Sequence, residues 1–130
     1  ILEINNKTTA DNILKSTKQE NRVKGDIGEN KAVKYLTDKG YEIIETNYKN
    51  KLGEIDIIAK DDTRIVFVEV KARATAKYGY PREAVNEYKQ RKIRMVAESY
   101  LKSKRLLNSY IRFDVIEILA GKITHLIAAF

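Results

Sequence analysis

The chain has 130 residues, 43% of them hydrophobic, and a formal net charge of +7 at pH 7. This is enough apolar material for one compact domain, and the absence of cysteine excludes disulfides, thiolate zinc sites and a cysteine nucleophile. The single histidine argues against a histidine-rich zinc site or a Ser-His-Asp triad, so any metal is expected to bind through oxygen.

No segment is apolar over the roughly 20 residues that a transmembrane helix needs. The longest uninterrupted apolar stretches are Ile65–Val68 and Leu126–Phe130. Residues 1–20 also lack the apolar core of a secretory signal. We therefore expect a cytoplasmic protein.

The chain is predicted to divide into residues 1–21 and a domain over residues 22–130. The first segment is polar, has no clear period and begins with Ile, so it is interpreted as an N-terminal arm or as the end of a preceding segment. The first helix of the domain is predicted over Val23–Lys39, where apolar residues follow helical spacing and Gly40 supplies a stop.

Three strands are predicted next, because runs rich in Ile, Val, Tyr and Phe are separated by turn sequences. They cover Tyr41–Tyr48, Gly53–Lys60 and Arg64–Ala72. A second amphipathic helix is predicted over Glu83–Lys104, and two closing strands cover Tyr110–Leu119 and Ile123–Phe130. This order predicts an α/β fold, with a mixed central sheet flanked by helices in the order α-β-β-β-α-β-β.

Charged residues interrupt two of the predicted strands. Glu69 and Lys71 are two residues apart, so they share one face of their strand with Ile65 and Phe67. The alternative is an edge strand that charged side chains protect from aggregation.

The position of Asp56 depends on the register of the hairpin that joins its strand to that of Glu69. A short turn within residues 60–63 is predicted to place Asp56 opposite Phe67 and Glu54 opposite Glu69. Asp56 then lies on the same face as Glu69 and diagonal to it, within reach of a shared ion. A slip of one residue would separate the two acids.

The first helix adds a third acid. Glu29 begins an i, i+3, i+4, i+7 stripe with Ala32, Val33 and Leu36, so it lies at the edge of the buried face. A carboxylate in this position is costly unless it is paired or binds a metal. The alternatives are a salt bridge to Lys71 or a side chain that reaches out to water.

Two or three carboxylates and a lysine on one sheet face form an oxygen site that suits Mg²⁺ or Mn²⁺. Such a site fits phosphodiester hydrolysis, because these ions polarise phosphate oxygens. Lys71 would stabilise the developing negative charge, or deprotonate the attacking water if its surroundings lowered its pKa.

The second helix carries most of the excess positive charge, which favours a nucleic acid as partner. Lys89 and Lys92 lie on its apolar face at i±4 from apolar residues, so they are predicted to contact phosphates, with snorkelling to water as the alternative. Arg73, after the strand of Glu69, is a further candidate phosphate contact. Between residues 89 and 105 the only acid is Glu98, and the basic residues are Lys89, Arg91, Lys92, Arg94, Lys102, Lys104 and Arg105.

The arrangement of Glu29, Asp56 and Glu69-Val70-Lys71 resembles the PD-(D/E)XK nuclease superfamily. Within it, the chain is similar to the YraN-type family of predicted endonucleases over roughly Val23 to Phe130. Five short segments in the same order carry this similarity, together with the terminal Ala129-Phe130: residues 24–29, 47–49, 53–58, 67–71 and 112–114.

The resemblance implies a restriction-endonuclease-like fold, related to archaeal Holliday-junction resolvases, and a nuclease that uses Mg²⁺ or Mn²⁺. Lys71 matches the lysine that assists attack by water, and Glu29 matches the helical acid that supports the metal or its waters. The residues implied to hold the metal are Asp56, Glu69, Val70 and Glu29. Early in the second helix, Lys89 and Gln90 are implied to line the site and contact nucleic acid.

Three functions remain open at this point. The leading hypothesis is a metal-dependent endonuclease that cleaves DNA, with branched DNA as a candidate substrate and a homodimer favoured if that substrate is symmetric. The second is a nuclease effector cut from a longer protein and neutralised by an immunity or regulatory partner. The third is a non-catalytic nucleic-acid-binding module, in which the acids form a structural ion-pair cluster.

Overall fold

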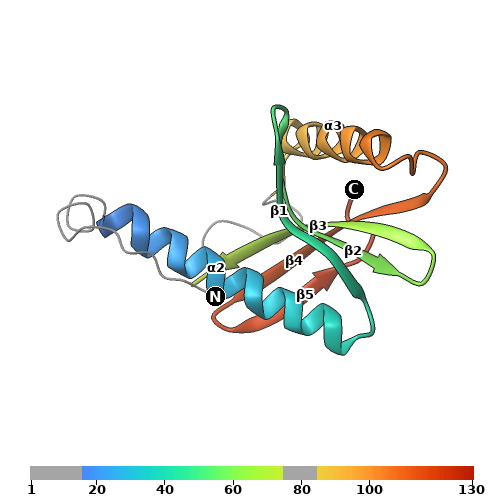
Figure 1. Ribbon diagram of the computed structural model, residues 1–130. Helices are drawn as coiled ribbons and strands as arrows, with labels where there is room; N and C mark the ends of the chain where they lie inside the picture. The colour runs from blue at the N-terminus through green and yellow to red at the C-terminus, as the bar shows by residue number, and fades with distance from the viewer. Residues whose placement is uncertain (1–15, 75–84) are drawn as a thin grey trace, which may run out of the picture.

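A computed structural model describes residues 16–74 and 85–130, with side chains from residue 27 onwards. The described elements form a five-stranded mixed sheet with one helix on each face (Figure 1), which confirms the predicted α/β fold and element order. Within this part of the chain, no helix combines the length and apolar character needed to cross a membrane. The elements are α2 (Ser16–Asp38), β1 (Glu42–Asn50), β2 (Gly53–Asp61), β3 (Arg64–Arg73), α3 (Glu87–Ser103), β4 (Tyr110–Leu119) and β5 (Lys122–Leu126).

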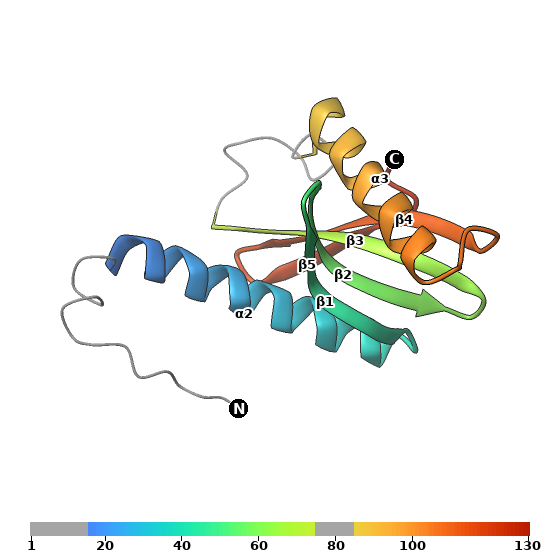
Figure 2. The same ribbon diagram turned by 45° about the horizontal axis from the view of Figure 1, so that its top comes forward.

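The strands follow their chain order across the sheet, β1-β2-β3-β4-β5. All neighbours are antiparallel except β3 and β4, which run parallel and pair along their whole lengths. A parallel pair needs a crossover connection, and the segment with α3 provides it. Strand β3 is therefore the middle of the sheet, with α3 on one side and α2 on the other (Figure 2).

Alternation along β3 divides the core into two layers. Phe67 lies in the apolar cluster that contains Val96 of α3. Its neighbour Val68 lies in the cluster that contains Leu36 of α2. Because side chains two apart share a face, Glu69 and Lys71 are placed on the α3 side of β3 with Phe67, as the sequence predicts.

Several element ends differ from the prediction. Helix α2 begins at Ser16 instead of residue 23, and the remainder of the predicted arm, residues 1–15, lies outside the described residues. Helix α3 begins at Glu87 instead of residue 83, because Asn86 is its N-cap and accepts the backbone N–H of Lys89 at 2.9 Å.

The last predicted strand also ends early. Strand β5 stops at Leu126, and the chain then turns so that the N–H of Ala129 donates to the carbonyl of Phe113 at 2.7 Å. The ring of Phe130 stacks on that of Phe113, with centroids 5.2 Å apart. The apolar character of the terminal residues therefore reflects packing against β4 and not strand pairing.

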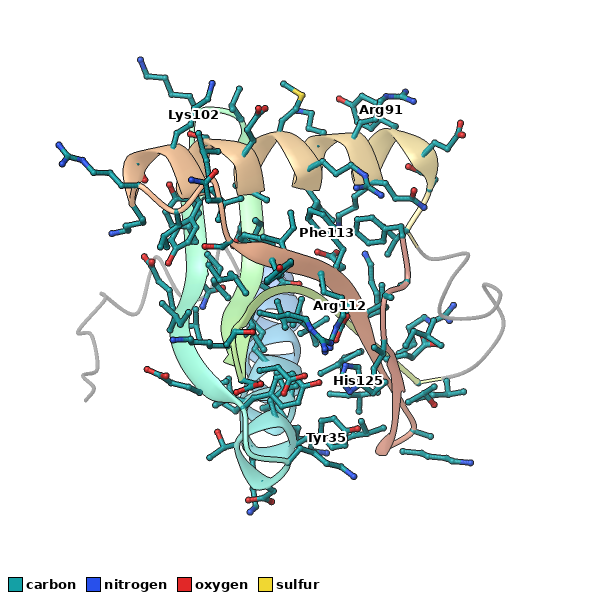
Figure 3. All side chains as sticks on the ribbon, turned by 90° about the vertical axis from the view of Figure 1, so that its right-hand side faces the viewer. Tyr35, Arg91, Lys102, Arg112, Phe113 and His125 are labelled. Carbon is teal, nitrogen blue, oxygen red and sulfur yellow. The ribbon has the colours of Figure 1, made fainter. Side chains whose placement is uncertain are left out.

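A buried polar network joins α2, β4 and β5 on the α2 face (Figure 3). Asp114, which is fully buried, accepts hydrogen bonds from the guanidinium of Arg112 at 2.9 Å and from the backbone N–H of Ala128 at 2.9 Å. Nε2 of His125 lies 2.7 Å from the same carboxylate, and its Nδ1 lies 3.2 Å from the hydroxyl of Tyr35 in α2. These partners satisfy the buried charge and fix α2 to the sheet.

Helix α2 also approaches β3 closely, because Gly28 faces Ala72. A Cβ atom added to Gly28 would lie 2.9 Å from the Cβ of Ala72, closer than side-chain carbons normally come. We expect Gly28→Ala to lower the free energy of unfolding by about 1–3 kcal/mol through overpacking, although alanine favours helices elsewhere. Urea unfolding would measure the loss.

The double variant Gly28→Ala/Ala72→Gly is the matched control, because it removes the β3 methyl group that the new methyl group on α2 would meet. It should recover most of the lost stability. A single variant as stable as the parent would contradict the close contact.

Candidate active site

Strands β2 and β3 pair over only part of their length. Their ladder runs from Asp61 and Arg64, beside the two-residue turn, to Ile57 and Val68, and includes no partners beyond that point. The predicted register is wrong by two residues, because Ile58 and not Asp56 opposes Phe67. A shift of two residues preserves the faces, so Asp56 and Glu69 are still brought together where the ladder ends.

The hairpin of β1 and β2 bends at this same point. The pairs Thr46–Ile57 and Tyr48–Ile55 flank Asn47 and Asp56, and Asn47 has a φ of 53°. Asparagine tolerates this left-handed conformation better than other residues with a Cβ. Beyond the bend the hairpin turns towards α3 (Figure 1), leaving the end of β3 without β2 as a neighbour.

Asp56 occupies the gap between the two strands. Its Oδ2 accepts the backbone N–H of Val70 at 2.8 Å, so a side chain replaces the missing strand partner. Burial, followed by the negative charge of Glu69, raises the pKa of Asp56 to about 7, and the charge of Glu29 adds to the rise. Two acids held so close in a partly dry site favour the binding of a cation.

Glu69 is almost completely buried, with 5% of its surface exposed, and two lysines approach the same oxygen. Nζ of Lys89 lies 2.6 Å from Oε2 of Glu69, and Nζ of Lys71 lies 3.6 Å from it. Burial, followed by the positive charge of Lys89, lowers the pKa of Lys71. For Lys89, burial acts against the charge, but the hydrogen bond and charge of Glu69 outweigh it and raise the pKa.

Asp56, Glu69 and Lys89 line a cavity of about 370 Å³ between the start of β2 and the start of α3. Lys92 lies at its exposed rim, with its Nζ 5.7 Å from the centre of the Tyr88 ring. The cavity therefore has an acidic floor and a basic, aromatic wall. Its lining residues are Gly53, Glu54, Asp56, Glu69, Asn86, Tyr88, Lys89, Lys92 and Ile93.

Glu29 approaches the acids from the other helix. It is half-buried, and it lines a separate cavity of about 320 Å³ together with Thr46 and Asn47 of β1. Its charge nevertheless contributes to the raised pKa of Asp56, so the two carboxyl groups interact electrostatically across the bend. Glu29 thus lies near the site without lining the main cavity.

Two predicted nucleic-acid contacts have other partners. The guanidinium of Arg73 forms a bidentate ion pair with the buried Glu117 of β4, with Nη2 donating to Oε1 at 2.7 Å. The side-chain amide of Gln90 donates to the carbonyl of Val85 at 2.9 Å, before the start of α3. Neither residue lines the main cavity, and their contact with nucleic acid stays a prediction.

The donor set is compatible with a hard divalent cation. Asp56 and Glu69 offer carboxylate oxygens in one cavity, and Mg²⁺ commonly binds through only one or two carboxylates together with water and substrate oxygens. Among the residues with described side chains, no three His, Cys, Asp or Glu side chains form a ready metal cage. The arrangement therefore fits Mg²⁺ or Mn²⁺ held partly by substrate better than a fully protein-enclosed ion.

Sequence reasoning missed three residues that shape the site: Asn47 at the bend, Asn86 at the start of α3 and Tyr88 on the cavity wall. Asparagine within a strand pattern was an available signal, because it is rare in strands and tolerates positive φ. Asn86 was readable as a helix cap. No local sequence pattern predicted that the side chain of Tyr88 would line the cavity.

Comparisons with known proteins give a consistent result. The family model described as "Uncharacterised protein family UPF0102" matches residues 28–118. A UPF0102 protein of Clostridioides difficile strain 630 is 52% identical over 112 residues, which cover 85% of this chain and 98% of that protein. A UPF0102 protein of Persephonella marina is 44% identical over 108 residues, covering 83% and 93% of the two chains. The matched region includes every acid of the candidate site.

The raised pKa of Asp56 has a consequence for stability. The folded protein keeps a proton on Asp56 between about pH 4 and pH 7, where the unfolded chain has lost it, so the free energy of unfolding falls as pH rises through this window. Asp56→Asn keeps the acceptor for Val70 and removes this cost. In EDTA, we expect the variant to exceed the parent by about 1–4 kcal/mol at pH 8, at roughly 1.4 kcal/mol per pKa unit.

Urea unfolding from pH 4 to pH 8 measures this difference, which should open as pH rises. The same change at Asp62, an exposed carboxylate in the β2–β3 turn, is the control. A difference between Asp56→Asn and the parent that does not depend on pH would contradict the argument.

Proposed function

The chain belongs to the uncharacterised protein family UPF0102, and we propose that it is a metal-dependent nuclease of the PD-(D/E)XK type that hydrolyses DNA phosphodiester bonds. One observation carries the proposal: the neighbouring carboxyl groups of Asp56 and Glu69 share a cavity with basic side chains of α3. Buried like charges are costly to a fold, so their presence together in a cavity points to function.

Asp56 and Glu69 are the residues that would hold Mg²⁺ or Mn²⁺. When bound, the ion supplies Lewis-acid polarisation of a phosphoryl oxygen. The hydrogen bond from Val70 to Asp56 fixes one carboxylate, and the burial of Glu69 fixes the other. Glu29 adds negative charge from α2, which strengthens the attraction for a cation.

Lys71 has the chemistry of the proton-handling group. Burial and the charge of Lys89 lower its pKa, so a larger fraction of its amine is neutral near pH 7 than for an exposed lysine. A neutral Nζ accepts a proton from the attacking water, whereas the ammonium form stabilises negative charge on the phosphorus oxygens. Lys71 lies two residues from Glu69 on the same face of β3, so in either protonation state its amine acts beside the acids.

The basic side chains of α3 supply the contact with DNA. Lys92 and Tyr88 lie at the cavity, and Arg91 and Lys102 point away from the sheet along the helix (Figure 3). Positive side chains spaced along a helix match the phosphates of a nucleic-acid backbone, which dominate affinity without reading sequence. This surface favours recognition of backbone and shape.

We expect Glu69→Gln to reduce cleavage of supercoiled plasmid in Mg²⁺ or Mn²⁺ about 100-fold or more, comparable to the loss of a transition-state-stabilising group. The change removes a charge at nearly constant volume. Glu54→Gln, an exposed acid at the edge of the same cavity, is the matched control and should cleave within a few-fold of the parent.

Reactions in EDTA establish metal dependence, and Glu69→Gln purified in the same way controls for contaminating nucleases. A set of branched and linear oligonucleotides defines the substrate. Equal cleavage by Glu69→Gln and the parent would overturn the proposed site. Salt-sensitive DNA binding without cleavage in either metal would favour a non-catalytic binding module instead.

A further inference from the structure

Lys89 and a divalent cation would compete for the same carboxylate. Nζ of Lys89 lies 2.6 Å from Oε2 of Glu69, closer than Lys71 at 3.6 Å. Glu69 is buried, whereas 42% of the Lys89 side chain is exposed at the mouth of the cavity. The lysine is therefore a counter-ion that reaches a buried acid from the solvent side.

We propose that Lys89 is a displaceable counter-ion, which neutralises Glu69 in the metal-free protein and turns to a substrate phosphate when a divalent cation binds Glu69. This inference rests on the proposed nuclease function and adds a coupling between its two ligands. The partner that draws Lys89 away is a phosphate of the nucleic-acid backbone.

The backbone of Lys89 is fixed, but its side chain has room to move. Its N–H donates to the cap residue Asn86 at 2.9 Å, which holds the start of α3 in place. The lysine stem is flexible and its ammonium carries three rotatable donors, so it can exchange one oxygen partner for another. We expect the ammonium to move towards Lys92 and Tyr88, because these residues line the same cavity of about 370 Å³.

Lys71 does not fit this role. It lies on β3 two residues from Glu69 and shares its face, its Nζ is farther from Oε2 at 3.6 Å, and its side chain is less exposed than that of Lys89, at 31% against 42%. Lys89 comes from a separate element and meets Glu69 only across the cavity. Like charges repel strongly at this separation in a partly buried site, so a cation on Glu69 drives away the more mobile lysine.

Metal and nucleic acid are then expected to assist each other's binding. A cation that releases Lys89 makes a phosphate contact available, and a phosphate that attracts Lys89 exposes Glu69 to the cation. Thermodynamic linkage requires the two effects to be equal in size.

The test is Lys89→Met, which keeps the apolar stem and removes the charge. By calorimetric titration of Mn²⁺ without nucleic acid, we expect about tenfold tighter binding than in the parent, because a competing charge is gone. Lys92→Met is the matched control, since it removes the same charge from the same cavity without removing the partner of Glu69. It should change the affinity by less than about threefold.

A second readout is the shift in melting temperature on adding Mn²⁺. Without metal, Lys89→Met leaves Glu69 with a weaker counter-ion and should melt below the parent. Mn²⁺ should then raise the melting temperature of this variant more than that of the parent. Lys89→Gln provides the same comparison with a neutral polar side chain if the methionine variant does not fold.

The coupling itself is measured by the affinity for a short DNA duplex in Ca²⁺ and in EDTA. The parent should bind more tightly in Ca²⁺ than in EDTA. Lys92→Met, which loses a DNA contact, should bind more weakly than the parent in both but keep this gain, whereas Lys89→Met should lose most of it. Unchanged or weaker Mn²⁺ binding by Lys89→Met, in a parent that binds Mn²⁺ and cleaves DNA, would overturn the inference and leave the nuclease proposal intact. If neither parent nor variant binds Mn²⁺, both proposals fail.

Discussion

The candidate site depends on the early end of the β2–β3 ladder. If β2 stayed beside β3 past Val68, the backbone N–H of Val70 would have a strand partner and no cavity would open above Glu69. The bend at Asn47 and Asp56 directs β2 away from β3. The carboxylate of Asp56 then accepts the N–H of Val70, which a continued β2 would otherwise pair with. A single side chain thus both closes the gap in the sheet and faces the acid on the neighbouring strand.

The acids of the candidate site are less well compensated than Asp114, the buried acid of the polar network on the α2 face. Around Asp114, a buried carboxylate is compensated by Arg112, His125 and the N–H of Ala128, and these partners hold its pKa below the usual range despite burial. Asp56 accepts the backbone N–H of Val70, but burial and the negative charge of Glu69 outweigh this hydrogen bond, so its pKa moves in the opposite direction. The contrast separates a structural acid from one suited to binding a cation.

The sequence predicted those features that depend on local periodicity. The shared face of Glu69 and Lys71 follows from strand alternation. The predicted register was wrong by two residues, but an even shift keeps each side chain on its face, so the prediction still placed Asp56 on the face of Glu69. The bend was not predicted, because it depends on the backbone conformation of Asn47 within a strand pattern. Helical spacing and the family resemblance both pointed to Lys89, but its contact with Glu69 depends on where the crossover places α3. The pairing of Arg73 with Glu117 required the parallel register of β3 and β4, which no local pattern encodes.

The parallel pairing of β3 with β4 also sets an order of events during synthesis. Residues 42–73 can form an antiparallel meander as soon as they leave the ribosome, but one edge of β3 has no partner until residues 110–119 emerge. Through that interval an apolar strand presents open backbone groups, which is the condition under which chains aggregate or bind chaperones. Glu69 and Lys71 lie on this strand, so charges assigned to chemistry in the finished fold also interrupt the apolar edge of the nascent one and oppose its aggregation.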